Sequence, residues 1–192
     1  MSIEQLLTNL KEGRWVSLST EIRPGIVKSE NGDIKPLYCT REFTFPANDQ
    51  FTLKFITYAD PYGQYPLVEM KMAGHISIGA QHPILEGAYE IDYAADVAFE
   101  IMPLHEQVTS ALNKGPAADS VAWSIGISKN VFLKSVPAFG LSANEPFKEY
   151  DLIFIFENML FNGARHIDGK PFNKPENRPT NLQIPLKKIN KP

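Results

Sequence analysis

The sequence predicts a mainly β protein: an antiparallel meander of about eight to nine strands that closes into a β-barrel, with an N-terminal helix and a short helical insert. Three observations indicate this fold class. Apolar and polar residues alternate with a period of two over most of the chain. Aromatic residues, which favour strands, make up 11% of the sequence, and 15 prolines and 12 glycines punctuate the alternating runs. Closure into a barrel removes the two unpaired edges that an open meander would leave.

Length and charge indicate a single domain. The chain has 192 residues, of which 43% are hydrophobic, so we expect one β-barrel domain over residues 1–192 with a substantial core. The formal net charge of −3 argues against a nucleic-acid partner. The charge is positive only from Arg165 onward, where seven residues are basic and two acidic. We interpret residues 165–192 as a Pro-rich basic segment that closes the barrel.

The sequence lacks the features of a membrane-spanning or secreted protein. No apolar stretch approaches the roughly 20 residues of a membrane-spanning helix. Residues 1–15 have neither the basic start nor the continuous apolar core of a secretory leader. Cys39 is the single cysteine, so an internal disulfide is excluded, and its apolar surroundings favour a buried, inert thiol. We therefore expect a soluble, cytoplasmic protein.

Two segments have helical spacing. Ser2–Gln5 is a capping-box pattern, and Gly13 follows as a stop signal, so residues 1–12 are predicted to be an amphipathic helix. The apolar face of this helix would consist of Ile3, Leu6, Leu7 and Leu10. Residues 104–113 interrupt the alternation and predict the helical insert.

The alternating runs are the predicted strands. They lie at residues 15–23, 37–45, 51–57, 67–79, 85–93, 97–101, 121–127, 131–135 and 151–157, with 181–186 as a possible closing strand. Turn residues separate them, among them Pro24-Gly25, Ser29–Asp33, Asn162-Gly163 and Asp168-Gly169.

Strong catalytic and cofactor motifs are absent from the sequence. It has no phosphate-binding glycine loop, no His-Glu-x-x-His, no Cys-x-x-Cys and no Gly-x-Ser-x-Gly, and its four histidines lack metal-ligand spacing. We therefore expect neither a cofactor nor a metal. Gly13-Arg14-Trp15, directly after the first helix, is similar to the start of lipocalin-type barrels. By that similarity Trp15 would close the base of the barrel, and Arg178 would be its cation–π partner.

A barrel of about eight strands is either filled by side chains or holds one small ligand. Small residues within the strands either leave room inside or mark bends, and function is expected in the interior or at its mouth. The candidate wall residues are Phe43, Leu53, Phe55, Met70, Met72, Tyr89 and Phe99. Arg23 or Arg41 would hold a ligand carboxylate.

Charged residues within the alternating strands are the candidates for proton transfer. Glu21, His75 and Glu90 are selected, because a carboxylate in an apolar interior has a pKa raised toward neutrality. The direction of Glu90 is left open by the pattern. If Tyr89 and Tyr93 point outward, then Glu90 points inward; if the aromatic face is the inner one, Glu90 lies in water.

Several blocks, taken in order, resemble the domain of the adenomatosis polyposis coli down-regulated family. They are Trp15–Ser17, Glu21–Gly25, Thr40–Phe45, Tyr58–Pro61, Met72–His75, Gly87–Tyr93 and Arg178–Leu186, so the resemblance extends over residues 13–187. It implies a lipocalin-like β-barrel with a hydrophobic pocket for a fatty-acyl group. Animal members carry two such domains, are secreted and membrane-anchored, and antagonise Wnt signalling by engaging its lipid.

This chain departs from that family pattern at its cysteines. The family has cysteines at the position of Thr20, near Tyr62-Gly63, and after the final Pro-Leu, and this sequence has none of them. The barrel and an apolar pocket therefore carry over as expectations, whereas the extracellular signalling role does not.

Three functional hypotheses follow. The leading one is a barrel that binds a hydrophobic small molecule, such as an acyl chain or a polyketide-like compound. The alternative is a cofactor-independent cyclase or isomerase of secondary metabolism that uses the same pocket with a Glu or His acid–base residue. The third is a protein-interaction module using the aromatic surface or the basic tail. The oligomeric state is left open.

Overall fold

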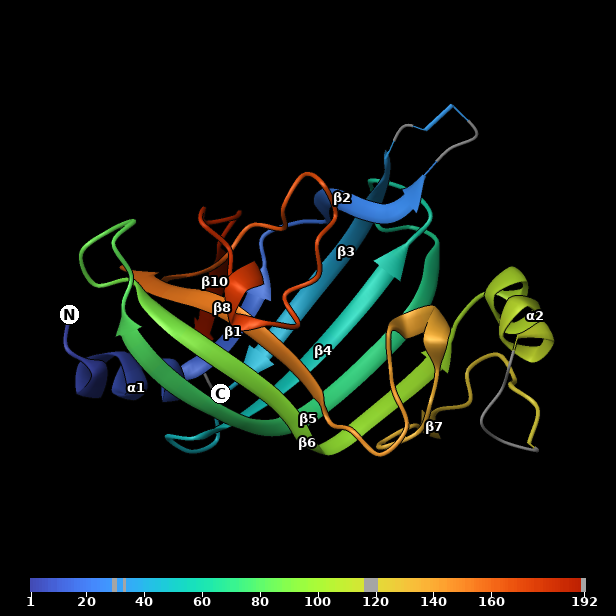
Figure 1. Ribbon diagram of the computed structural model, residues 1–192, viewed down its shortest axis with the longest axis horizontal. Helices are drawn as coiled ribbons and strands as arrows, with labels where there is room; N and C mark the ends of the chain where they lie inside the picture. The colour runs from blue at the N-terminus through green and yellow to red at the C-terminus, as the bar shows by residue number, and fades with distance from the viewer. Residues whose placement is uncertain (29–30, 33, 116–120, 191–192) are drawn as a thin grey trace.

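The computed structural model describes residues 1–28, 31–32, 34–115 and 121–190. In this part of the chain ten antiparallel strands form a ring (Figure 1), which confirms the predicted fold class. The strands are β1 (Gly13–Ser17), β2 (Glu21–Lys28), β3 (Ile34–Thr44), β4 (Gln50–Tyr58), β5 (Pro66–Gln81), β6 (Tyr89–Pro103), β7 (Lys129–Asn130), β8 (Phe147–Phe156), β9 (Met159–Asn162) and β10 (Leu186–Asn190).

The ring closes through its first strand. The sheet order is β1-β10-β9-β8-β6-β5-β4-β3-β2, and β1 also pairs with β3, so that β1 joins the two ends of the sheet. β1 occupies the end of β3 at residues 42–44, while β2 pairs with β3 nearer the start of that strand. β7 adds a short pairing to β6 beyond the end of β8. The result is barrel-like.

Helix α1 (Ile3–Lys11) confirms the predicted N-terminal helix. Its capping box is present, since the Ser2 hydroxyl accepts from the Gln5 backbone N–H and the Gln5 side chain accepts from the Ser2 N–H. Leu6 and Leu10 are buried, and the Trp15 indole N–H donates to the Leu10 carbonyl over 3.0 Å. α1 therefore packs on one end of the ring through its apolar face (Figure 1).

Helix α2 (Glu106–Lys114) is the predicted insert, shifted by two residues at its start, and it lies at the opposite end of the molecule from α1 (Figure 1). Two short 3₁₀ helices, η1 (Pro137–Phe139) and η2 (Pro175–Asn177), lie in the long connections on either side of β8 and β9.

Two predictions near the N-terminus were wrong. The run 15–23 is two strands, because the chain leaves the sheet at residues 18–20. Pro24-Gly25 lies inside β2 and is not a turn. Pro24 stands opposite Pro36, beside a shift of register in the β2–β3 pair, so the missing proline N–H interrupts the ladder where the pairing is already irregular. The predicted turn at Ser29–Asp33 lies partly outside the described residues.

Other strand predictions also required correction. Residues 85–93 and 97–101 were treated as two strands, but β6 runs continuously from Tyr89 to Pro103. Residues 121–127 and 131–135 are not strands. Trp123 and Val131 are buried from a loop, whereas Val121, Ile125, Ile127 and Leu133 are exposed. Asn113 of α2 binds both the N–H and the carbonyl of Trp123 and so satisfies the backbone there. The closing strand is 186–190, not 181–186.

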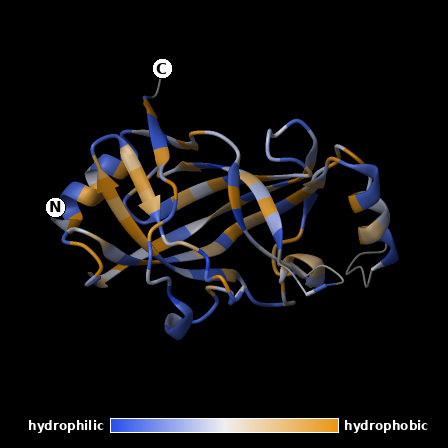
Figure 2. Ribbon diagram, turned by 90° about the horizontal axis from the view of Figure 1, so that it is seen from above, coloured by the Kyte–Doolittle hydropathy of each residue, from blue (hydrophilic) through white to orange (hydrophobic). Residues whose placement is uncertain are grey.

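The core lies on the inner face of the ring. Apolar and polar residues are interspersed along the strands (Figure 2), and the buried positions alternate with more exposed ones. Phe43, Phe51 and Tyr93 form the centre of the aromatic core, with ring centroids 5.0–6.4 Å apart. Cys39 is fully buried, and burial raises the pKa of its thiol.

No helix in the described ranges is long and apolar enough to cross a membrane.

Candidate functional site: a polar cluster inside the ring

The inner face of the ring brings the predicted wall residues together. The register places Leu53, Met72 and Phe99 side by side on β4, β5 and β6, and Phe55 beside Met70 one step further along. Most of these side chains are buried, together with Phe43 and Tyr89, whereas Phe55 and Met70 are only partly buried. The inner face is therefore apolar over β3–β6, and it is least closed at Phe55 and Met70.

Beside this apolar wall lies a set of polar side chains that we call the inner polar cluster. It consists of Ser17, Glu21, Arg23, Arg41, Tyr93, Glu149, Asp151 and Asn162. Tyr93 belongs to both parts, since its ring packs on Phe43 and Phe51 while its hydroxyl accepts a hydrogen bond from Asn162.

Glu21 is the anionic centre of the cluster. Its carboxylate accepts from Arg41 Nε at 2.9 Å, from Arg23 Nη2 at 2.6 Å and from the Ser17 hydroxyl at 2.7 Å, and the residue is only 3% exposed. Burial alone would raise the pKa of Glu21, but the charges and hydrogen bonds of Arg41 and Arg23 outweigh it and hold the pKa below its usual value. Glu21 is therefore an anion at neutral pH that pairs with both arginines.

Arg41 connects opposite parts of the ring. It reaches from β3 to β9, where its Nη1 donates to the Asn162 side-chain oxygen over 2.8 Å. Asn162 in turn donates to the Tyr93 hydroxyl at 3.2 Å and to the Leu152 carbonyl at 3.3 Å. The bonds of Arg41 to Glu21 and Asn162 leave it little capacity to hold a ligand. Arg23 is better placed, since its Nη1 has no partner among the described residues.

Glu149 and Asp151 form a carboxyl pair on the inner face of β8. Glu149 stands opposite Tyr93 in the β6–β8 register, and Asp151 follows two residues later on the same face. Burial raises the pKa of Glu149. Burial, followed by the negative charge of Glu149, raises the pKa of Asp151 to about 7. This pair can accept or release a proton near neutral pH.

The structure does not bring the three predicted proton-transfer residues together. Glu21 is inside the ring, whereas His75 and Glu90 lie on the outer face of β5 and β6. The side chain of His75 is 44% exposed and bonded to Asp96 at 2.9 Å. Glu90 lies 3.7 Å from Arg178. Of the two directions left open for Glu90, the outward one is found, with Tyr89 and Tyr93 inside.

The sequence interpretation missed three members of the cluster. Glu149 was not singled out, and Asp151 was treated only as the start of an apolar strand. Asn162 was interpreted as part of an Asn-Gly turn, but it ends β9 as a buried side chain. The alternation of Phe147, Glu149, Asp151 and Ile153 along one strand face was the available signal.

The predicted Trp15–Arg178 contact is wrong. The cation over Trp15 is Lys188, whose Nζ lies 5.8 Å from the ring centroid. Arg178 instead lies over Tyr150 and donates to the backbone carbonyls of Ile91 and Asp151 and to the Asp92 carboxylate. Arg178 therefore links the C-terminal segment to β6 and β8.

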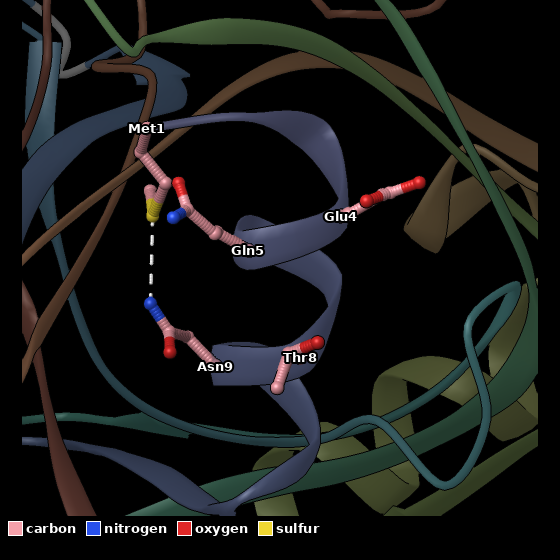
Figure 3. A pocket seen from close by; sticks show the side chains of 5 residues that line it. All are labelled: Met1, Glu4, Gln5, Thr8 and Asn9. Atoms are coloured by element: carbon pink, nitrogen blue, oxygen red, sulfur yellow. Dashed lines mark hydrogen bonds between the residues drawn. The ribbon is translucent and has the colours of Figure 1, made fainter.

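A separate hollow of about 480 Å³ lies on the surface of α1. It is lined by Met1, Glu4, Gln5, Thr8 and Asn9, none of which was a predicted site residue. Figure 3 shows that these side chains spread around the helix, with Glu4 pointing away from the contact between Asn9 and the Met1 sulfur. Its lining therefore lacks converging polar groups. Within the described residues no three His, Cys, Asp or Glu side chains are grouped so as to hold a metal ion.

The comparison with protein families supports the resemblance seen in the sequence. The family model described as "Adenomatosis polyposis coli down-regulated 1" matches residues 3–122. The match includes the members of the inner polar cluster on β1, β2, β3 and β6 and ends before β8, which supplies Glu149 and Asp151, and β9, which supplies Asn162. Because the match covers more than half of the sequence, the chain belongs to the adenomatosis polyposis coli down-regulated 1 family.

Proposed function

We propose that this protein binds a hydrophobic small molecule, such as an acyl chain or a polyketide-like compound, inside the ring. The observation that carries the proposal is the composition of the inner face, on which an aromatic and methionine wall meets the inner polar cluster, where Arg23 Nη1 has no partner among the described residues. Ligand sites of this kind are mostly apolar and contain a few placed polar groups. In this arrangement Arg23 holds an acidic or carbonyl oxygen of the ligand, while Arg41 and Glu21 fix the cluster.

The apolar wall predicts how affinity depends on the length of the ligand's acyl chain. Each buried methylene contributes about 0.8 kcal/mol, which is about fourfold in Kd. A series of fluorescent fatty acids of increasing length should therefore show a stepwise gain until the chain fills the interior. Native mass spectrometry of protein purified without denaturation tests for a ligand carried from the cell.

The wall position Met70 offers a matched pair of variants. Met70→Trp fills the inner face at the place where it is least closed, and we expect it to weaken fatty-acid binding by about tenfold or more. Lys71→Trp places the same ring one residue later, on the outer face, where Lys71 is 55% exposed. Binding that is equal in the two variants, or no saturable binding by the wild type, would contradict the proposal.

A further inference from the structure

The inner polar cluster contains an acid–base set that ligand binding alone does not require. Its members are the carboxylate of Asp151, the neighbouring carboxylate of Glu149 and the hydroxyl of Tyr93, which stands opposite Glu149. They border the aromatic part of the wall, since the Tyr93 ring lies 5.0 Å from Phe51 and 5.6 Å from Phe43.

Asp151 is held in one orientation by the backbone. Its Oδ1 accepts from Leu152 N–H at 2.7 Å and Gly163 N–H at 2.8 Å. A Cβ at Gly163 would approach Oδ1 to 2.5 Å and the Pro179 ring to 2.3 Å, so only glycine allows this approach. Arg178 Nη1 also donates to the Asp151 carbonyl over 2.6 Å. The carboxylate is therefore preorganised, as a general base requires.

The second oxygen of Asp151 is available. Oδ2 has no hydrogen bond to any described residue. Among those residues, every side-chain nitrogen or oxygen that is cut off from solvent has a partner, so Oδ2 retains some contact with water and can accept a further hydrogen bond. Because burial and Glu149 raise the pKa of Asp151 to about 7, this oxygen can both take up and return a proton at neutral pH.

Tyr93 supplies a hydrogen-bond donor beside this base. Its hydroxyl accepts from Asn162 and donates to no described residue, so its own hydrogen is free. Arg41 Nη1 donates to the Asn162 side-chain oxygen at 2.8 Å and holds this side chain in place. Asn162 in turn holds the Tyr93 hydroxyl in place. Burial keeps the phenol protonated, because it raises the pKa of Tyr93 above that of a free tyrosine.

We infer that Asp151 and Tyr93 form a proton-transfer site that isomerises an apolar β,γ-unsaturated ketone to its conjugated α,β-unsaturated isomer. The inference rests on the proposed binding function. Asp151 Oδ2 removes a proton from the carbon between the carbonyl and the double bond, and the C–H electron pair forms a dienolate whose oxygen accepts the Tyr93 hydrogen bond. The protonated Asp151 then returns the proton to the γ carbon. Product and substrate are isomers, so no oxidant, reductant or cofactor is consumed.

The test uses a straight-chain β,γ-unsaturated methyl ketone of about ten carbons as the probe. Wild-type protein is expected to bind the ketone, to generate the ultraviolet absorbance of the conjugated enone and, in D₂O, to incorporate deuterium at the exchanged carbons. Its rate should rise with pH and level off above about pH 7, following deprotonation of Asp151.

Two variants separate catalysis from packing. Asp151→Asn keeps the Oδ1 acceptor and should retain ketone binding while losing about 10²–10⁴-fold in kcat. Tyr93→Phe keeps the ring and should lose about 10²–10³-fold. Asp96→Asn, the same change on the outer face of β6, is the control and should leave the rate unchanged.

Two outcomes overturn the inference. If the wild type binds the ketone but neither isomerises it nor exchanges its protons faster than buffer, the proton-transfer site is refuted while the binding function stands. If neither the ketone nor a fluorescent fatty acid binds, the proposed function fails and the inference with it.

Discussion

Arg41 of β3 and Asn162 of β9 meet inside the ring, where Arg41 Nη1 donates to the Asn162 side-chain oxygen over 2.8 Å. The two residues are 121 positions apart in the sequence. Through this contact the inner polar cluster joins the part of the chain that matches the family model to the part beyond it. The same contact gives the fold a buried polar connection between strands on opposite sides of β1 and β10.

Removal of the Arg41 guanidinium should be costly. Arg41→Met removes the donor to the Asn162 side-chain oxygen and leaves Glu21 with Arg23 as its one remaining cation. We therefore expect the free energy of unfolding to fall by about 3–5 kcal/mol. Arg41→Lys should not restore the lost stability, because an ammonium cannot bind Glu21 and Asn162 with the geometry of a guanidinium. Urea unfolding of both variants measures the effect.

The control for Arg41 is an exposed ion pair. Arg14 and Glu42 lie 2.7 Å apart with side chains 46% and 33% exposed, so Arg14→Met should cost at most about 1 kcal/mol. Equal losses in Arg41→Met and Arg14→Met would mean that the inner polar cluster does not hold the ring together.

The carboxyl pair makes stability depend on pH in an unusual direction. Asp151 has a pKa of 3.8 when unperturbed and about 7 in the fold. Between these values the folded protein binds the extra proton, so stability falls as the pH rises from about 4 to 7 and is then constant. The penalty above pH 7 is at most about 4 kcal/mol. Glu21 acts oppositely, since its lowered pKa means that its contribution is lost only as the solution becomes acidic.

Asp151→Asn isolates this effect. The variant lacks the ionisation penalty, so unfolding in urea at pH 5 and pH 8 should give a smaller difference in stability than for the wild type. Asp96→Asn should retain the wild-type difference, because Asp96 lies half exposed on the outer face. A wild-type protein that is more stable at pH 8 than at pH 5 would show that Asp151 does not carry the raised pKa.

Gly163 should not tolerate a side chain. Because a Cβ there would lie 2.3 Å from the Pro179 ring and 2.5 Å from Asp151 Oδ1, Gly163→Ala is expected to destabilise the fold by about 1–3 kcal/mol through overpacking. Gly115→Ala is the control, since its added Cβ meets no atom closer than 3.5 Å. Thermal unfolding of both variants distinguishes them, and a neutral Gly163→Ala would contradict the described approach of Gly163 to Asp151.

The outer-face candidates should be dispensable. His75→Ala and Glu90→Gln are expected to change fatty-acid affinity by less than twofold and stability by no more than about 1 kcal/mol, because both side chains lie partly exposed outside the ring, where an ion pair contributes little. Fluorescence titration and urea unfolding give the two readouts. A large loss of binding in either variant would place the ligand on the outer face.

Local signals made some elements predictable. The capping box at Ser2–Gln5 and the helical spacing of Leu6 and Leu10 depend on neighbours within the same turn, so the sequence was sufficient for α1. The alternation in β3–β5 and the turns between them were likewise local. The face of β6 that points inward could not be predicted from local sequence, because Tyr89 and Glu90 alternate with similar regularity. Only the closed ring shows which of the two faces is the inner one.

The inner polar cluster depended on tertiary structure. Glu21 and Arg23 were noticed because they interrupt an apolar pattern, and both are in the cluster. Asn162 had no comparable signal, since Asn-Gly is equally typical of a turn. Its role arises from Arg41, far away in the sequence, and no local pattern contains that partner.

The position of β1 between β3 and β10 also has a consequence for biosynthesis. Translation delivers β1 first, but its pairing with β10 becomes possible only after residues 186–190 have been synthesised. Until then the nascent chain keeps open sheet edges at β1 and β9. The ring is thus completed only when β10 pairs with β1, and emerging chains of this protein are most exposed to aggregation in the interval before that pairing.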